Sequence, residues 1–193
     1  MTLFYTVRTG ETTWEAESRI ESLTGAPLSE AGKERSRRVG LELVPHEPTV
    51  VYASSGEAEQ EAAKLIAKAL GVKVRTDKRL SEIDYGLWQG LTVEEIKRRQ
   101  PTLYKQWIES PGSVRPPGGE TLDDAGHRIA EALRDIVCRE RKESPVLVLR
   151  PVVLGLLRCR MEAADVDDLW QQVADDFAWA SYDIEAVTLK SGA

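Results

Sequence analysis

Four short runs of apolar, β-branched and aromatic residues constrain the fold of this chain more than any other feature. They cover residues 3–7, 49–53, 72–75 and 146–149. The segments between them include residues 29–43, 57–70 and 121–140, whose apolar spacing is that of amphipathic helices. Ser29 is the expected N-cap of the first helix, and Gly71 is the expected stop of the second. Strands that alternate with helices predict an α/β fold, because parallel strands need a crossover to return to the same edge of a sheet.

The remaining segments complete a prediction of one domain over residues 1–193. We expect a three-layer sandwich: a mainly parallel central sheet with helices on both faces. Residues 92–99 and 101–108 predict two short helices, and the Pro- and Gly-rich residues 111–120 predict a surface loop. The stretch from about 79 to 120 is therefore an excursion over the sheet. A helix is expected at residues 153–160, and a last strand near the sheet edge at residues 183–189.

The composition is ordinary for a globular protein, and it argues against several classes of function. The chain has 193 residues, of which 41% are hydrophobic and 30% charged, with a net charge of −6. Without a basic stripe, a nucleic acid is not an expected partner. No apolar run approaches the roughly 18 residues that a membrane span needs. Because no secretory pattern precedes the first strand, we expect a cytoplasmic location.

The two cysteines do not predict a chemical site. Cys138 and Cys159 are far apart and lack the spacing of metal ligands. We interpret both as ordinary thiols of a reducing compartment, and we predict neither a metal nor a cofactor.

Six blocks of sequence, in order along the chain, resemble the signatures of one enzyme family. Residues 7–12 (VRTGET) look like an Arg-His-Gly signature that follows a first strand and continues to Glu-Thr. Residues 27–32 (PLSEAG) resemble the pattern Pro-Leu-Thr-x-x-Gly. The other blocks are residues 51–54, 80–92, 116–121 and 146–149. Together they resemble the histidine phosphatase (phosphoglycerate-mutase-like) superfamily from residue 3 to about residue 157.

The resemblance implies a phosphoryl-transfer site at known positions. In that family one histidine attacks phosphorus, a second histidine and two arginines hold the phosphoryl oxygens, and a carboxylic acid protonates the leaving oxygen. Carried over position by position, Arg8 is the first arginine and Glu82 is the acid, here a vestigial one.

Three of the family's positions hold residues that cannot do this chemistry. Thr9 stands at the position of the nucleophile, and Pro151 at that of the second histidine. The second arginine falls on Ala58, and no basic residue occurs at 55–60 if the gap differs. The resemblance therefore implies a degenerate member of the family that lacks both catalytic histidines.

No other histidine is expected to replace the missing ones. His46 lies between prolines before a strand, at the end of the sheet where ligands do not bind in α/β folds. His127 lies on a polar stretch of the long helix.

Arg150, one residue before Pro151, leaves two interpretations open. It is either an ordinary surface arginine or, with Arg8, part of a site that holds a phosphate or carboxylate without reacting with it. Arg8 and Glu82 are likewise either ligand-binding residues or remnants that pair with each other.

We predict a catalytically inactive pseudophosphatase that binds a small phosphorylated or anionic ligand or a protein partner. One alternative is an active phosphomonoester phosphatase or mutase-like enzyme with Thr9 as an unorthodox nucleophile. Another is a structural subunit of a homo-oligomer.

Arg115 is the one basic residue beside residues 116–117, where the resemblance places a basic pair in the phosphoglycerate mutases. This favours the small phosphatase branch of the family.

Overall fold

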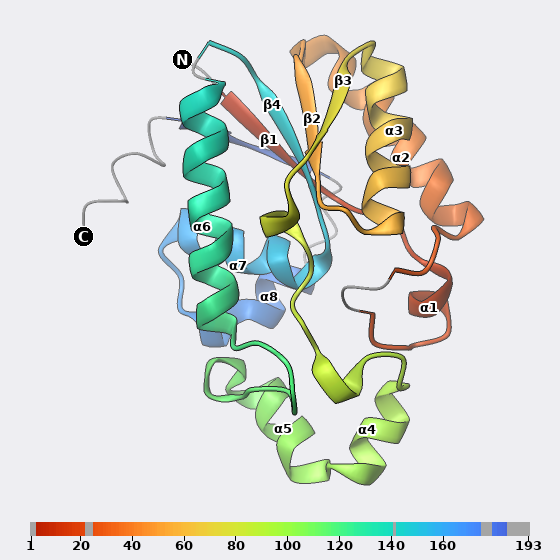
Figure 1. Ribbon diagram of the computed structural model, residues 1–193, viewed down its shortest axis with the longest axis vertical. Coiled ribbons are helices and arrows are strands. Elements are labelled where there is room, and N and C mark those ends of the chain that lie inside the picture. The colour runs from red at the N-terminus through yellow and green to blue at the C-terminus, as the bar shows by residue number, and fades with distance from the viewer. Residues whose placement is uncertain (1–2, 22–24, 141, 175–178, 185–193) are drawn as a thin grey trace.

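The computed structural model describes residues 3–21, 25–140, 142–174 and 179–184, which form a five-stranded sheet flanked by helices (Figure 1). The strand order is β3-β2-β4-β1-β5. Four strands are parallel, and β5 runs antiparallel to β1 at the edge. The strands are β1 (Leu3–Arg8), β2 (Val50–Ala53), β3 (Lys73–Thr76), β4 (Pro145–Leu149) and β5 (Trp179–Asp183).

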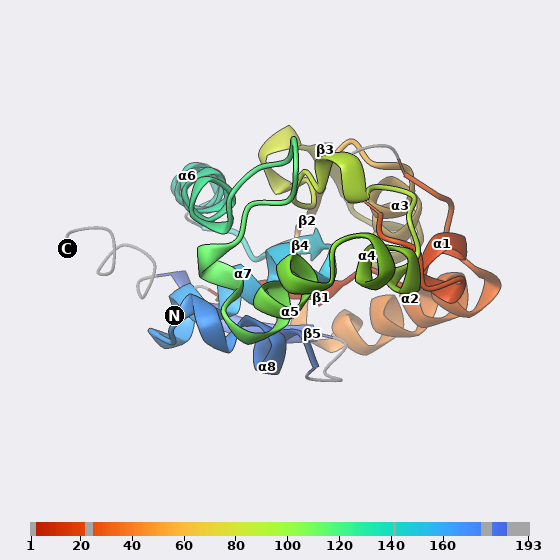
Figure 2. The same ribbon diagram turned by 90° about the horizontal axis from the view of Figure 1, so that it is seen from below.

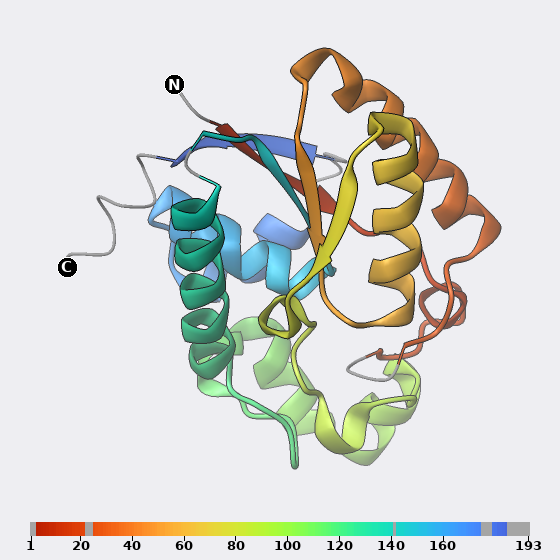
Figure 3. The same ribbon diagram turned by 45° about the horizontal axis from the view of Figure 1, so that its top comes forward.

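Helices cover both faces of the sheet, because the side chains of its central strands alternate between two apolar cores. Tyr5 and Val7 of β1 belong to the core under α2 (Glu30–Leu43) and α3 (Glu57–Leu70). Phe4 belongs to the core under α6 (Leu122–Arg139) and α7 (Pro151–Glu162). Figures 1 and 3 show these two pairs of helices on opposite sides of the strands. The three-layer α/β prediction is confirmed.

The segment between β3 and α6 lies beyond the carboxyl ends of the parallel strands. It contains α4 (Val93–Arg99) and α5 (Pro101–Glu109), which Figure 2 shows from below, in front of the strands. Thr92 caps α4: its hydroxyl accepts the N–H of Glu95, and the Glu95 carboxylate accepts the N–H of Thr92. Trp88 and Trp107 attach the segment to the core, with ring centroids 6.0 Å apart and both side chains buried.

The structure differs from the sequence prediction at several element boundaries. Helix α7 begins at Pro151, two residues earlier than expected, because proline suits the first turn of a helix. The edge strand is β5, and residues 185–189 of the predicted last strand lie outside the described residues. Two helices were not predicted, α1 (Thr13–Ala16) and α8 (Leu169–Ala174), since so few residues give no periodic pattern.

The sheet topology brings the two predicted arginines to the same edge. Strands β1 and β4 are parallel neighbours, with Arg8 opposite Leu149. The loop after β1 packs backbone to backbone on α2: a Cβ atom on Gly10 would lie 2.2 Å from the Gly32 carbonyl oxygen. None of the helices in the described ranges has the length and apolar character needed to cross a membrane.

Candidate functional site

Two adjoining pockets lie at the carboxyl ends of β1 and β4. One, with a volume of about 220 Å³, is lined by Arg8, Glu82, Arg150 and Pro151 among others. The other, about 340 Å³, is lined by Arg8, Thr9, Glu11, Glu15 and Arg35. Arg8 lines both, so the structure brings the predicted site residues together around this arginine.

Arg150 is buried, with 3% of its surface exposed. Its Nη2 atom lies 3.1 Å from Glu21 Oε2 and 3.4 Å from Glu15 Oε1. Its Nε and Nη1 atoms have no hydrogen-bond partner in the part of the chain that the structure describes. The interpretation of Arg150 as a surface arginine is therefore wrong: its guanidinium is buried with the Glu21 carboxylate and beside the half-buried Glu15.

The segment that begins at Thr12 supplies both carboxylates. The Thr12 hydroxyl accepts the N–H of Glu15, whose carboxylate accepts the N–H of Thr12, and this capping box starts α1. The same hydroxyl donates to Glu21 Oε2 at 2.5 Å, and Glu21 Oε1 accepts the N–H of Ala26 at 2.9 Å. Burial raises the pKa of Glu21, while the charge of Arg150 and the Thr12 hydrogen bond act against that shift.

Glu82 closes the amino end of α7. Its carboxylate is buried and accepts the backbone N–H groups of Ile83 at 2.8 Å, Val152 at 3.0 Å and Val153 at 3.2 Å. Arg150 is the N-cap residue of α7, but its side chain accepts no hydrogen bond from the helix. Glu82 therefore accepts the first N–H groups of α7 in place of a capping side chain. Burial raises the pKa of Glu82 to about 7, although Arg150 and the backbone donors favour the charged form.

Thr9 and Ala58 bring no charged side chain to the site. The buried Thr9 hydroxyl lies 3.4 Å from the Leu149 carbonyl oxygen, which also accepts the Thr9 N–H at 2.9 Å. A carbonyl oxygen cannot act as the base that a threonine nucleophile needs. Ala58 is fully buried in the core between α2, α3 and the sheet.

Both histidines of the chain lie away from the two pockets. His46 is in the turn before β2, where its ring centroid is 4.9 Å from that of Trp179 and 5.6 Å from that of Tyr5. His127 is exposed on α6, and its Nδ1 atom lies 2.9 Å from the carbonyl oxygen of Asp123. Neither residue lines either pocket.

The sequence prediction missed three residues of this site. Glu15 has a signal in the sequence, because a capping box places Glu three residues after Thr12. Arg35 lies on α2, one turn after Gly32, and lines the pocket of Arg8 and Thr9. Glu21 has no such signal, since it lies in an irregular segment and meets Arg150 across 129 residues of sequence.

With this geometry in view, the chain can be compared with known proteins. A family model described as "Histidine phosphatase superfamily (branch 1)" matches residues 4–188. The chain belongs to this superfamily. The chain is 30% identical over 178 residues to "Phosphoserine phosphatase 1" of Hydrogenobacter thermophilus, which covers 92% of this chain and 83% of that protein. It is 29% identical over 153 residues to "Probable phosphoglycerate mutase GpmB" of Serratia proteamaculans, covering 79% of this chain and 71% of that protein.

Solved structures of superfamily members share the fold. "Bacillus stearothermophilus YhfR" superposes with a TM-score of 0.84 at 31% identity, covering 88% of this chain and 84% of that one. A mycobacterial glucosyl-3-phosphoglycerate phosphatase complexed with VO3 has a TM-score of 0.84 at 23% identity, covering 96% and 95% of the two chains. At that identity the second likeness concerns the fold alone.

Proposed function

We propose that this superfamily member binds a small anion, such as a phosphomonoester, without transferring its phosphoryl group. The observation that carries the proposal is the buried Arg150, whose Nε and Nη1 atoms lack partners in the described residues and which lines a pocket with Arg8. A buried donor without an acceptor costs about 1–3 kcal/mol. Oxygen atoms of a bound anion would supply the missing acceptors, and Arg8 would add a second positive charge.

The residues at the family's catalytic positions support binding without transfer. Thr9 stands where the nucleophile is needed, and Pro151 stands where a second histidine would hold the phosphoryl group. Loss of one member of a catalytic unit can lower a rate by a factor on the order of 10⁶. We infer that this chain is a pseudophosphatase.

The charges in the pocket predict weak affinity. Arg8, Arg19 and Arg150 line the pocket, and so do the carboxylates of Glu15, Glu21 and Glu82. The α7 N–H groups that would hold an anion already bond Glu82. We therefore expect a dissociation constant near the millimolar range, equal to a binding free energy of about 4 kcal/mol.

Isothermal titration at low salt tests the binding. The ligands are phosphate, sulfate, O-phosphoserine and 3-phosphoglycerate, the last two chosen from the names of the relatives. Arg8→Gln should weaken binding by about tenfold, equal to ~1.4 kcal/mol. Arg37→Gln is the matched control, because Arg37 is exposed on α2 and pairs with Glu34 outside both pockets. Absence of binding at about 10 mM, or an Arg8→Gln variant that binds as well as wild type, would contradict the proposal.

One observation favours a second candidate, an active phosphomonoesterase. A carboxylic acid with a pKa of about 7, as at Glu82, suits the general acid that protonates a leaving oxygen. The relative named as a phosphoserine phosphatase fits this candidate too. Turnover of p-nitrophenyl phosphate that stops in Thr9→Ala would favour it, whereas equal background rates in both proteins are expected from the pseudophosphatase.

A further inference from the structure

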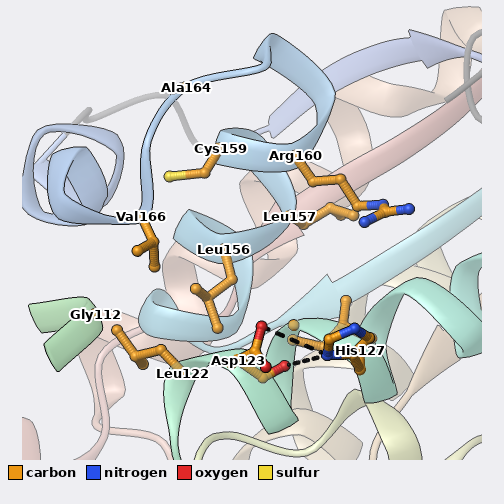
Figure 4. A pocket seen from close by; sticks show the side chains of 12 residues that line it. Gly112, Leu122, Asp123, His127, Leu156, Leu157, Cys159, Arg160, Ala164 and Val166 are labelled. Carbon is orange, nitrogen blue, oxygen red and sulfur yellow. Dashed lines mark hydrogen bonds and ion pairs between the residues drawn. The ribbon is translucent and has the colours of Figure 1, made fainter. Parts of the chain in front are cut away.

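Outside this site, a pocket of about 410 Å³ lies between α6 and α7 (Figure 4). It lies along the later part of α7 and shares no lining residue with the two pockets near Arg8. Its walls are mainly apolar, with Leu122, Ile129, Leu156, Leu157 and Val166 contributing. The volume falls within the range of roughly 300–1,000 Å³ that small-molecule sites occupy.

A glycine inside α6 keeps this pocket open. Gly126 lines it, and a Cβ atom added there would meet no atom of the described residues within 4 Å. Glycine within a helix is less favourable than alanine by about 1 kcal/mol. At Gly155, by contrast, a Cβ atom would lie 2.7 Å from Leu169 Cδ1, so close packing explains that glycine. In the part of the chain that the structure describes, no packing contact explains Gly126, and its missing side chain leaves space at the pocket wall.

The polar groups of the pocket are gathered on one side. In Figure 4, Arg160 and His127 lie opposite Val166 and Gly112. His127 Nδ1 is 3.6 Å from Asp123 Oδ1, and Arg160 is exposed at the rim. The pocket therefore combines an apolar wall with a polar end that holds the Arg160 guanidinium and the His127–Asp123 pair.

Cys159 contributes to the wall rather than to a reaction. The residue is buried, and burial raises the pKa of its thiol to about 11. A protonated thiol behaves as a small apolar group, so a covalent ligand is not implied.

We propose that this pocket binds a small aromatic or branched apolar molecule that carries one anionic group. The apolar body packs against Leu156 and Leu157, and the anionic group lies beside Arg160. This site is independent of the proposed anion site, so the two proposals fail separately.

Two fluorescent probes test the proposal on the full chain. The probe 8-anilinonaphthalene-1-sulfonate has an apolar body and one sulfonate, and N-phenyl-1-naphthylamine has the same rings without the charge. We expect one molecule of the sulfonate to bind per chain, and about tenfold more tightly than the neutral probe, equal to ~1.4 kcal/mol. Arg160→Gln should remove this difference by weakening the binding of the sulfonate alone. Equal affinities of the two probes for wild type would overturn the assignment of an anionic ligand.

A filled pocket provides the second arm of the experiment. Gly126→Leu places a side chain in the open space without a backbone clash, and it should weaken both probes by at least about tenfold, again ~1.4 kcal/mol. Glu131→Leu is the matched control, because it adds the same side chain to an exposed position of α6 outside the pocket. Unchanged binding in Gly126→Leu, or equal losses in both variants, would show that the probes bind elsewhere and would overturn the proposal.

Discussion

At the scale of single residues, Arg150 and its partners determine the balance of charge in the site. Its guanidinium is buried beside Glu21 and Glu15, so its charge is largely balanced within the protein. A buried ion pair adds little net stability over an apolar replacement, but removing one partner leaves an uncompensated charge in the interior. The family's chemistry needs unbalanced positive charge at this edge of the sheet, and here the protein supplies its own counter-charges.

The burial of Arg150 predicts that removing its charge lowers the stability of the protein more than removing the charge of an exposed arginine. Arg150→Gln should lower the free energy of unfolding by about 3 kcal/mol, because Glu21 then remains buried without its counter-charge. Arg37→Gln should cost less than about 1 kcal/mol, because the Arg37–Glu34 pair is exposed. Urea denaturation measures both. The double variant Glu21→Gln/Arg150→Gln should recover part of the loss, and a double variant no more stable than Arg150→Gln would contradict the pairing.

Glu82 predicts a pH dependence of stability. Burial raises its pKa in the folded protein to about 7 from an ordinary value of 4.5. Its stabilising contribution is therefore fully present below pH 4.5 and is lost as the pH rises through about 7, with a difference on the order of 3 kcal/mol. Glu82→Gln lacks this titration, so wild type should lose stability relative to the variant between about pH 5 and pH 8. A constant difference across that range would contradict the assignment.

At the scale of elements, periodicity predicted the long helices and the four parallel strands but not the short pieces that shape the site. Apolar spacing in residues 57–70 is a strong signal because 14 residues repeat it over several turns. Helix α1 has four residues and an irregular continuation to Glu21. Its position against Arg150 depends on contacts between distant segments, which a sequence pattern does not record.

The packing around α6 and α7 predicts opposite effects of alanine at Gly126 of α6 and at Gly155 of α7. At Gly155 a Cβ atom would approach Leu169 Cδ1 to 2.7 Å and Val173 Cγ2 to 2.8 Å, so Gly155→Ala should cost about 1–3 kcal/mol. The Cβ atom of Gly126→Ala would meet none of the described atoms within 4 Å, so this variant should stabilise the protein by up to about 1 kcal/mol. Guanidinium denaturation measures the free energy of unfolding of both variants. Changes of the same sign in the two variants would contradict this account of the two glycines.

The amino end of α7 predicts that Thr9→His alone does not create a phosphatase. The helix donors Val152 and Val153 already bond Glu82, and Pro151 and Ala58 supply no further group for the phosphoryl oxygens. Each missing donor is worth roughly 3–4 kcal/mol of transition-state stabilisation. The single variant should hydrolyse p-nitrophenyl phosphate near background, and a triple change at Thr9, Ala58 and Pro151 should do better. Strong activity in Thr9→His would mean that the site encloses phosphate better than we infer.

At the scale of the whole molecule, the order of six sequence blocks was enough to predict the family and its three-layer fold. The same comparison predicted the positions where a family histidine or arginine is replaced, because those positions are defined by residue type. It did not predict that Glu15 and Glu21 surround Arg150 or that Glu82 caps α7, since these contacts exist only after distant segments pack. The fold could therefore be predicted from the local sequence patterns and the order of the blocks. The balance of charge in the site could be seen only in the structure.

The central claim, binding without phosphoryl transfer, is tested most directly by phosphorus NMR of a phosphomonoester with a stoichiometric amount of protein. With O-phosphoserine, we expect its signal to shift or broaden with wild type and to return to the free value with Arg8→Gln. We expect no inorganic phosphate signal to grow over hours. A growing inorganic phosphate signal that disappears in Thr9→Ala would contradict the account and establish an active phosphatase.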